Sequence, residues 1–263
     1  MKTLRIKDKN PDVAVLQRSL NKLGWKLSTD GIFGSGTEKA VKEFQAKYGL
    51  SVDGIVGRGS WNTLIKNTRD KLYPIQSLNI SQNGLNFIYK HEALRGTSEY
   101  FHHPSMASGV TLGPGYDFKE RNSKEVRETL SKIGLNQSQI DLAAKAVGLT
   151  GEEAKAFCKA NKDAIKLTKE QEVKLLEICV KPYVELVKRY VRTDLSQTEF
   201  DALVDFAYNP GKVLNRVCGY VTSGDFYAAM DLLDDIVKSG SKELPGLVTR
   251  RYDEKTLFVD GIY

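Results

Sequence analysis

The stretch Ser108–Asp117, which reads SGVTLGPGYD, decides the local fold in the middle of the chain. Three glycines and a proline surround Thr111 and Asp117 within it. Glycine allows backbone angles that other residues avoid and proline fixes one, so the stretch is too interrupted for a helix. We predict a tight β-hairpin that presents Thr111 and Asp117 at defined places.

Glu92 is a second acidic residue, upstream of this hairpin. Residues 85–92 carry apolar side chains at helical spacing, with Ser81 or Asn83 as the cap, so Glu92 falls in the last turn and on the apolar face. The negative helix end and desolvation both disfavour the charged carboxylate, which suits a general acid. The alternative is an ordinary helix-end glutamate. Glu92 and Asp117 together could flank a sugar–sugar bond, as a glycosidase requires.

Composition narrows the class of protein. The 263 residues are 41% hydrophobic and 27% charged, as in a soluble globular protein with one large domain or two unequal ones. A net charge of +6 and a pI near 9.0 suggest an anionic partner: nucleic acid, a membrane surface or cell wall. The basic residues are scattered and lack an aromatic-interleaved pattern, which disfavours nucleic acid.

The cysteine and histidine patterns favour neither a metal nor a disulfide. Cys158, Cys179 and Cys218 form no CxxC pair, and Cys179 stands among apolar residues as a buried thiol would. His102 and His103 lack a third spaced ligand. The charged N-terminus has no apolar export segment, and no stretch approaches a membrane span. We expect no cofactor, no membrane insertion and a monomer.

A short repeat marks the N-terminal part of the chain. Asp30–Thr37, DGIFGSGT, returns 23 residues later as Asp53–Ser60, DGIVGRGS. Each copy predicts an Asp-Gly turn followed by a helix start with a serine or threonine cap. Apolar residues at helical spacing before, between and after the copies predict three short helices, the last one brief: residues 13–23, 40–45 and 61–65.

This N-terminal pattern resembles the three-helix peptidoglycan-binding domain of cell-wall hydrolases over residues 10–65. The resemblance implies a shallow groove with Trp25, Asp30 and Phe33 near the glycan or stem peptide. The alternatives are that Trp25 and Phe33 belong to the core and that Asp30 caps a turn. We predict a binding domain over 1–66, a tethering linker over 67–82 and a catalytic domain over 83–263.

The rest of the chain is predicted to be helical. The expected helices are residues 123–133, 137–146, 151–161, 168–190, 197–208 and 225–239. The motifs Ala202–Gly211, ALVDFAYNPG, and Gly246–Phe258, GLVTRRYDEKTLF, resemble the phage-type lysozymes. Within the second motif, Arg250 and Arg251 are interpreted as a structural pair. The implied fold is α+β and mainly α-helical, with a three-helix binding domain linked to a lysozyme-like domain of a small β-hairpin and a helical bundle.

The catalytic set departs from the commonest phage pattern. That pattern has an aspartate about nine residues after the glutamate, where this chain has Phe101, and a threonine about six further on. The hairpin stretch instead resembles pesticin-like muramidases, whose second acid lies downstream of the threonine. The resemblance implies Glu92, Thr111 and Asp117 as the catalytic set. The alternative for Asp117 is that it caps a helix.

The implied reaction is hydrolysis of the β-1,4 bond between N-acetylmuramic acid and N-acetylglucosamine. Glu92 would protonate the leaving oxygen, Asp117 would activate water or stabilise the transition state, and Thr111 would position the water. Three residues are candidates for sugar contacts in the cleft: Tyr116, Tyr208 and Asn209.

These resemblances together indicate a modular endolysin. It would stay in the host bacterial cytoplasm until lysis and then act on peptidoglycan. Three alternatives remain open: an antibacterial effector or bacteriocin, a lytic transglycosylase, and a non-catalytic wall-binding or structural virion protein.

Overall fold

A computed structural model describes residues 1–209, 213–239 and 242–263. The chain is mainly helical with short antiparallel strand pairs, which confirms the α+β prediction. It forms two compact units, Met1–Gly84 with Tyr183–Tyr263 and Leu85–Pro182, which differ from the domain division expected from the sequence. Pro210 and Gly211 of the first lysozyme-like motif lie outside the described residues.

The N-terminal helices pack around a shared apolar core, as predicted. Their bounds are α1 Pro11–Lys22, α2 Ser35–Lys47 and α3 Arg58–Thr68. Asn10 caps α1 by accepting from the Val13 N–H, and Pro11 takes the first helical position. Trp61 and Phe44 are fully buried between the helices. The third helix is longer than predicted, because polar residues on its exposed side interrupt the apolar pattern there.

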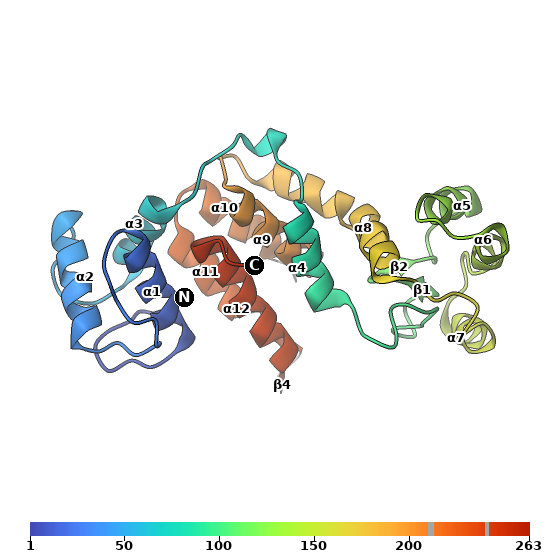
Figure 1. Cartoon of the computed structure of the whole chain (residues 1–263), viewed down its shortest axis with the longest axis horizontal. Helices are drawn as coiled ribbons and strands as arrows, with labels where there is room; N and C mark the ends of the chain where they lie inside the picture. The colour runs from blue at the N-terminus through green and yellow to red at the C-terminus, as the bar shows by residue number, and fades with distance from the viewer. Residues whose placement is uncertain (210–212, 240–241) are drawn as a thin grey trace. The chain divides into compact units, whose positions relative to one another are not determined.

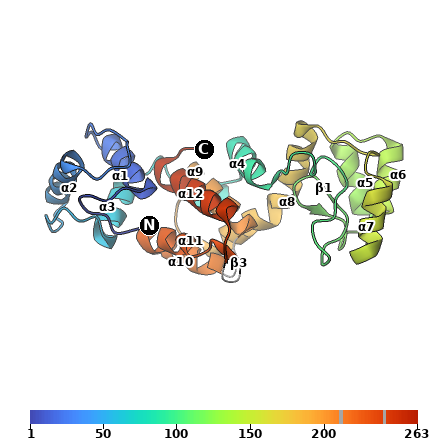
Figure 2. The same ribbon diagram turned by 90° about the horizontal axis from the view of Figure 1, so that it is seen from below.

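The C-terminal helices complete the same compact unit. They are α9 Gln197–Tyr208, α10 Leu214–Thr222, α11 Phe226–Asp234 and α12 Pro245–Asp260, with β3 Lys238–Ser239 and β4 Lys242–Glu243 between the last two. α12 packs against α9 and α11 (Figure 2). The helix predicted over 225–239 ends at Asp234, and β3 begins at Lys238 within the predicted range.

The N-terminal helices pack directly on the C-terminal ones. α1 contacts α12 and α3 contacts α11 (Figure 1). Ion pairs line this junction: the Arg18 Nε lies 2.7 Å from Asp260 Oδ2, and Arg58 pairs with Asp225. The two parts therefore form one packed body.

The segment predicted as a linker is anchored along its length. Arg69 Nε donates to Glu199 Oε1 at 2.7 Å. Tyr73 and Leu195 exchange backbone hydrogen bonds of 2.8 and 3.1 Å, just before the 3₁₀ turn η1, Ile75–Ser77. Residues 69–77 thus follow the surface of the C-terminal helices.

The second unit holds the hairpin and its supporting helices. Its elements are β1 Thr111–Leu112, β2 Tyr116–Asp117, α5 Ser123–Lys132, α6 Gln137–Ala144 and α7 Gly151–Ala160. The division between the units falls within two helices, α4 Gln82–Glu92 and α8 Lys169–Tyr190. Ser81 caps α4, because its Oγ accepts from the Gly84 N–H at 2.9 Å. An aromatic cluster around Phe101 and Phe118 forms the core beneath the hairpin.

Candidate active site

The hairpin brings Thr111 and Asp117 together as predicted. The two strands pair antiparallel with Thr111 opposite Asp117. Directly opposite residues point to the same face of a pair, so these two side chains are neighbours. Gly113 and Gly115 adopt φ of +63° and +97°, which explains why glycine is needed at the turn.

The carboxylate of Asp117 is held by backbone donors on both sides. Gly109 N–H donates to Oδ2 at 3.1 Å, and Lys119 N–H donates to Oδ1 at 2.8 Å. A Cβ on Gly109 would lie 2.5 Å from Asp117 Oδ1, so only glycine fits there. The side chain stays half-buried and borders open space. Asp117 therefore links the hairpin to the loop before it rather than capping a helix.

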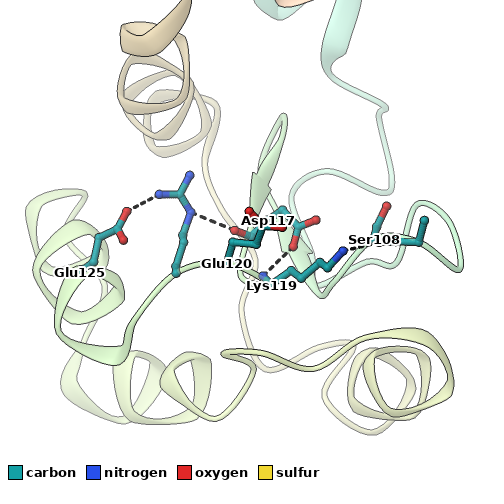
Figure 3. Close-up of a pocket in the computed structure, with 7 residues that line it drawn as sticks. Ser108, Asp117, Lys119, Glu120 and Glu125 are labelled. Carbon is teal, nitrogen blue, oxygen red and sulfur yellow. Dashed lines mark hydrogen bonds and ion pairs between the residues drawn. The ribbon is translucent and has the colours of Figure 1, made fainter.

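A cavity of about 530 Å³ opens beside this carboxylate (Figure 3). Its lining consists of Ala107, Ser108, Asp117, Lys119, Glu120, Arg121 and Glu125. Arg121 Nε donates to the Asp117 carbonyl at 2.9 Å, and its guanidinium also pairs with Glu125. Arg121 and Glu125 were missed from the sequence, although their i,i+4 spacing was a usable signal.

Thr111 and Tyr116 are both buried, on opposite faces of the hairpin. Thr111 is 3% exposed, and its backbone exchanges hydrogen bonds of 2.8 and 2.9 Å with His102. Burial lowers the pKa of His102. Tyr116 is fully buried, edge-on to Phe118 with the Arg121 guanidinium 3.9 Å from its ring centroid. Tyr116 is thus a core residue, and the prediction that it offers a sugar-stacking face is corrected.

Glu92 is the last residue of α4 and is half-buried. The loop that follows returns to the hairpin, where Gly113 N–H donates to the Ser98 carbonyl at 2.8 Å. Glu92, Thr111 and Asp117 therefore belong to one compact unit, joined by a loop that is tied to the hairpin turn.

Two further candidate residues lie in the other unit. The Tyr208 ring is half-buried, 4.8 Å from that of Tyr183. Asn209 ends α9 as an exposed residue, and its carbonyl accepts from Arg251 Nη2 at 2.7 Å. Arg251 also pairs with buried Glu254 at 2.7 Å. Arg251 is therefore structural, as predicted.

Arg250 has the same kind of environment. It is 4% exposed, and its Nη2 lies 3.0 Å from Asp205 Oδ1, which is fully buried. Both arginines thus join α12 to α9, and neither offers a free guanidinium to a substrate.

The two Asp-Gly turns of the N-terminal repeat share one hydrogen-bond pattern. Gln17 Nε2 donates to Asp30 Oδ1 at 2.9 Å, to the Ile32 carbonyl at 3.1 Å and to Thr37 Oγ1 at 3.2 Å. The Gln17 bond to Oδ1 is the main cause that lowers the pKa of Asp30, and the Ile32 N–H, which donates to the same oxygen at 2.9 Å, lowers it further. The Asp30 carboxylate thus shapes the turn, as the alternative interpretation held.

Gln45 repeats the pattern at the second turn. Its Nε2 donates to Asp53 Oδ1 at 2.8 Å, to the Ile55 carbonyl at 2.9 Å and to Ser60 Oγ at 3.3 Å. Serine and threonine were expected to cap the helices that follow, but Gly34 and Gly57 occupy the cap positions. The hydroxyls accept from the buried glutamines instead.

Of the two aromatic candidates in this part, only Trp25 reaches the surface. Phe33 is fully buried and belongs to the core. Trp25 is half-buried, donates to Glu43 Oε2 at 2.9 Å and packs edge-on against Phe44. Trp25 and exposed Asp30 remain the candidates for a wall contact.

The described ranges contain no cluster of three histidine, cysteine or acidic side chains arranged to hold a metal ion. Over those same ranges no helix combines the length and apolarity needed to cross a bilayer.

Two family models match this chain, one in its N-terminal region and one over most of the remainder. Residues 9–64 match the family described as "Putative peptidoglycan binding domain", and residues 89–248 match the one described as "Domain of unknown function (DUF8812)". The endolysin of Bacillus phage B103 is 38% identical over 98 residues, which are 36% of this chain and 37% of that protein. The spore cortex-lytic enzyme of Oceanobacillus iheyensis is 30% identical over 138 residues, 52% of this chain and 46% of that protein.

The matched segments thus span less than half the length of these curated relatives. Among solved structures, the muramidase domain of SpmX from Asticaccaulis excentricus aligns with a TM-score of 0.46 and 24% identity, covering 69% of this chain and 97% of that one. The DUF8812 model matches more than half of the chain, and the protein therefore belongs to this family.

Proposed function

We propose that the protein is a modular endolysin that hydrolyses the bond between N-acetylmuramic acid and N-acetylglucosamine in bacterial peptidoglycan. The observation that carries the proposal is the register of the hairpin, which sets Thr111 opposite Asp117 beside a cavity of about 530 Å³. Similarity to phage and spore-cortex lytic enzymes and the match to a peptidoglycan-binding family support it. The protein acts as a monomer and remains in the host cytoplasm until lysis.

In this mechanism Glu92 protonates the departing glycosidic oxygen. Asp117, oriented by two backbone N–H groups, activates a water or stabilises the oxocarbenium-like transition state. Thr111, opposite Asp117, positions the water by hydrogen bonding. Acid–base assistance of this kind contributes about 10²–10⁴-fold to the rate. The N-terminal helices, with Trp25 and Asp30 at their surface, hold the enzyme on its polymer.

The test is mass spectrometry of fragments released from purified peptidoglycan. The wild type should release muropeptides with reducing N-acetylmuramic acid ends, and Glu92→Gln and Asp117→Asn should release almost none. Glu177→Gln, an exposed glutamate on α8, serves as the control and should match the wild type. Anhydro ends would instead identify a lytic transglycosylase, and reducing N-acetylglucosamine ends a glucosaminidase. Wall binding without release would leave a non-catalytic protein.

A further inference from the structure

A second cavity of about 410 Å³ lies in the same unit as the hairpin, between the last turn of α4, the loop after it and the start of α8. It shares no lining residue with the Asp117 cavity. Tyr89 and Lys90 line it from α4, Arg95 from the loop, and Lys169 and Glu172 from the first turn of α8. The proposed mechanism uses none of these side chains.

Glu172 is the unusual member of this lining. It is 5% exposed, and one carboxylate oxygen, Oε2, accepts from the Tyr89 hydroxyl at 2.8 Å. The other oxygen, Oε1, is buried and has no hydrogen-bond partner among the described residues. A buried carboxylate oxygen without a donor is costly, so one left in a native cavity points to a donor supplied by a ligand.

The rim of the cavity carries the opposite charge. Lys90, Arg95 and Lys169 are exposed, and within the described ranges Arg95 forms no ion pair. Lys169 Nζ lies 5.6 Å from the Tyr89 ring centroid. The carboxylate of Glu99, which also lines the cavity, already has a donor, because its Oε2 accepts from the Gly96 N–H at 2.9 Å. The cavity thus pairs an inner acceptor with outer cations, which fits a group that carries an ammonium and a carboxylate on one carbon.

We propose that this cavity binds the zwitterionic end of a diamino acid in the peptidoglycan stem peptide. Glu172 accepts from the ammonium, and Arg95 with Lys90 binds the carboxylate. This assignment rests on the proposed function, because it names a subsite for the same substrate.

The stem peptide is long enough to extend from the sugar at Glu92 to this cavity. Tyr89 lies three residues before Glu92 in α4, a rise of about 4.5 Å along a helix. A stem peptide extends by about 3.3 Å per residue, so its third residue lies about 10 Å from the muramic acid that bears it. A peptide attached to the sugar that Glu92 protonates can therefore span the distance.

The first experiment measures binding of a small probe to the full chain by calorimetry. The probe is the tripeptide L-alanyl-γ-D-glutamyl-meso-diaminopimelate. The comparison peptide has L-lysine in the third position and so lacks the distal carboxylate. We expect the wild type to bind the first peptide at least tenfold more tightly than the second. Glu172→Gln should weaken binding of the diaminopimelate peptide at least tenfold, and Arg95→Gln should remove the preference over the lysine peptide.

Glu170→Gln is the matched control, because Glu170 lies in the same helical turn but is exposed. It should bind as the wild type does. Equal binding of both peptides by the wild type, equal binding by the wild type and Glu172→Gln, or no binding would overturn the subsite. If Glu172→Gln does not fold, binding of the two peptides to the surface variant Arg95→Gln tests the subsite on its own.

A second measurement separates this subsite from the proposed function. Glu172→Gln should lower kcat/KM about tenfold on intact wall and leave it unchanged on glycan strands freed of their peptides. No hydrolysis of either substrate by the wild type would refute the muramidase, and the peptide titration would still report on the cavity. Hydrolysis with the same loss on both substrates would refute the subsite and leave the muramidase.

Discussion

The backbone N–H of Gly109 holds Oδ2 of Asp117 at 3.1 Å, so the loop before β1 and the end of β2 meet at the candidate catalytic carboxylate. Neighbouring atoms surround Gly109 closely. A Cβ at Gly109 would also lie 3.0 Å from the Leu149 carbonyl oxygen, and that backbone atom cannot yield as a flexible side chain would. The position of the carboxylate therefore depends on a residue that carries no functional group.

Gly109→Ala should impair catalysis although it replaces none of the reacting groups. The new methyl group displaces the Asp117 carboxylate, and a misplacement of about 1 Å costs about 10² in rate. We expect kcat on purified peptidoglycan to fall about 10²-fold with little change in wall binding. Gly219→Ala, at a helical position with nothing within 4 Å, is the control and should keep full activity. Full activity in Gly109→Ala would refute the positioning role of this contact.

Gln45→Met should destabilise the N-terminal helices. The substitution keeps the side-chain volume but leaves buried acceptors at the second Asp-Gly turn without their donor, and the Gly54 N–H loses its acceptor at 2.9 Å. We expect the free energy of unfolding to fall by about 2–4 kcal/mol. Urea denaturation measures it, and Gln82→Met, at an exposed position, is the control. Gln17→Met should behave like Gln45→Met, and a midpoint unchanged in both would contradict the role of the repeat.

His102 should make stability depend on pH. Burial lowers its pKa in the folded state below the ordinary value of 6.5. Above pH 6.5 the ring is neutral in both states. As the pH falls through 6.5, the unfolded chain binds a proton that the folded chain does not, so the free energy of unfolding falls.

His102→Gln should therefore reduce the loss of stability on acidification. The measurement is the shift of the urea midpoint between pH 7.5 and pH 5.5, with each protein's pH 7.5 midpoint as its own reference. The shift should be smaller in His102→Gln than in the wild type. An identical shift in both proteins would show that another group accounts for the acid sensitivity.

The cysteines should be inert in the folded protein. All three are buried, and burial raises the pKa of Cys158 to about 11 and those of Cys179 and Cys218 to about 12. The thiolate is the reactive form, so a disulfide reagent at pH 8 should label none of them until the chain is unfolded. Absorbance of the released thiol with and without urea measures this. Rapid labelling without urea would place a thiol at the surface.

Local sequence patterns predicted an element correctly where local and tertiary interactions favour the same structure. The helix Gln197–Tyr208 has the predicted bounds, and a capping box of Ser196 and Glu199 fixes its start. The hairpin followed from its glycines and proline. α12 was not predicted as a helix, because buried charges such as Arg251 and Glu254 interrupt the apolar stripe by which amphipathic helices are identified.

Some features of the candidate site could also be predicted from the sequence and others could not. Thr111 and Asp117 followed from motif and resemblance, whereas the buried position of Tyr116 did not. Alternation along a strand would have predicted it, because a residue next to Asp117 points to the opposite face. Arg121 and the Gly109 contact depend on how the loops close around the hairpin, which no local pattern encodes.

The packed junction between the N-terminal and C-terminal helices bears on how the N-terminal helices can be transferred to another protein. Asp225 and Asp260 are 8% and 4% exposed, and they meet Arg58 and Arg18 from the N-terminal helices. A chimera that grafts residues 1–66 onto another hydrolase would carry a charged face without its complement and would leave two buried aspartates behind without cations. For this protein the transferable module is therefore the whole packed body, and an exchange of the N-terminal helices has to redesign both sides of the junction together.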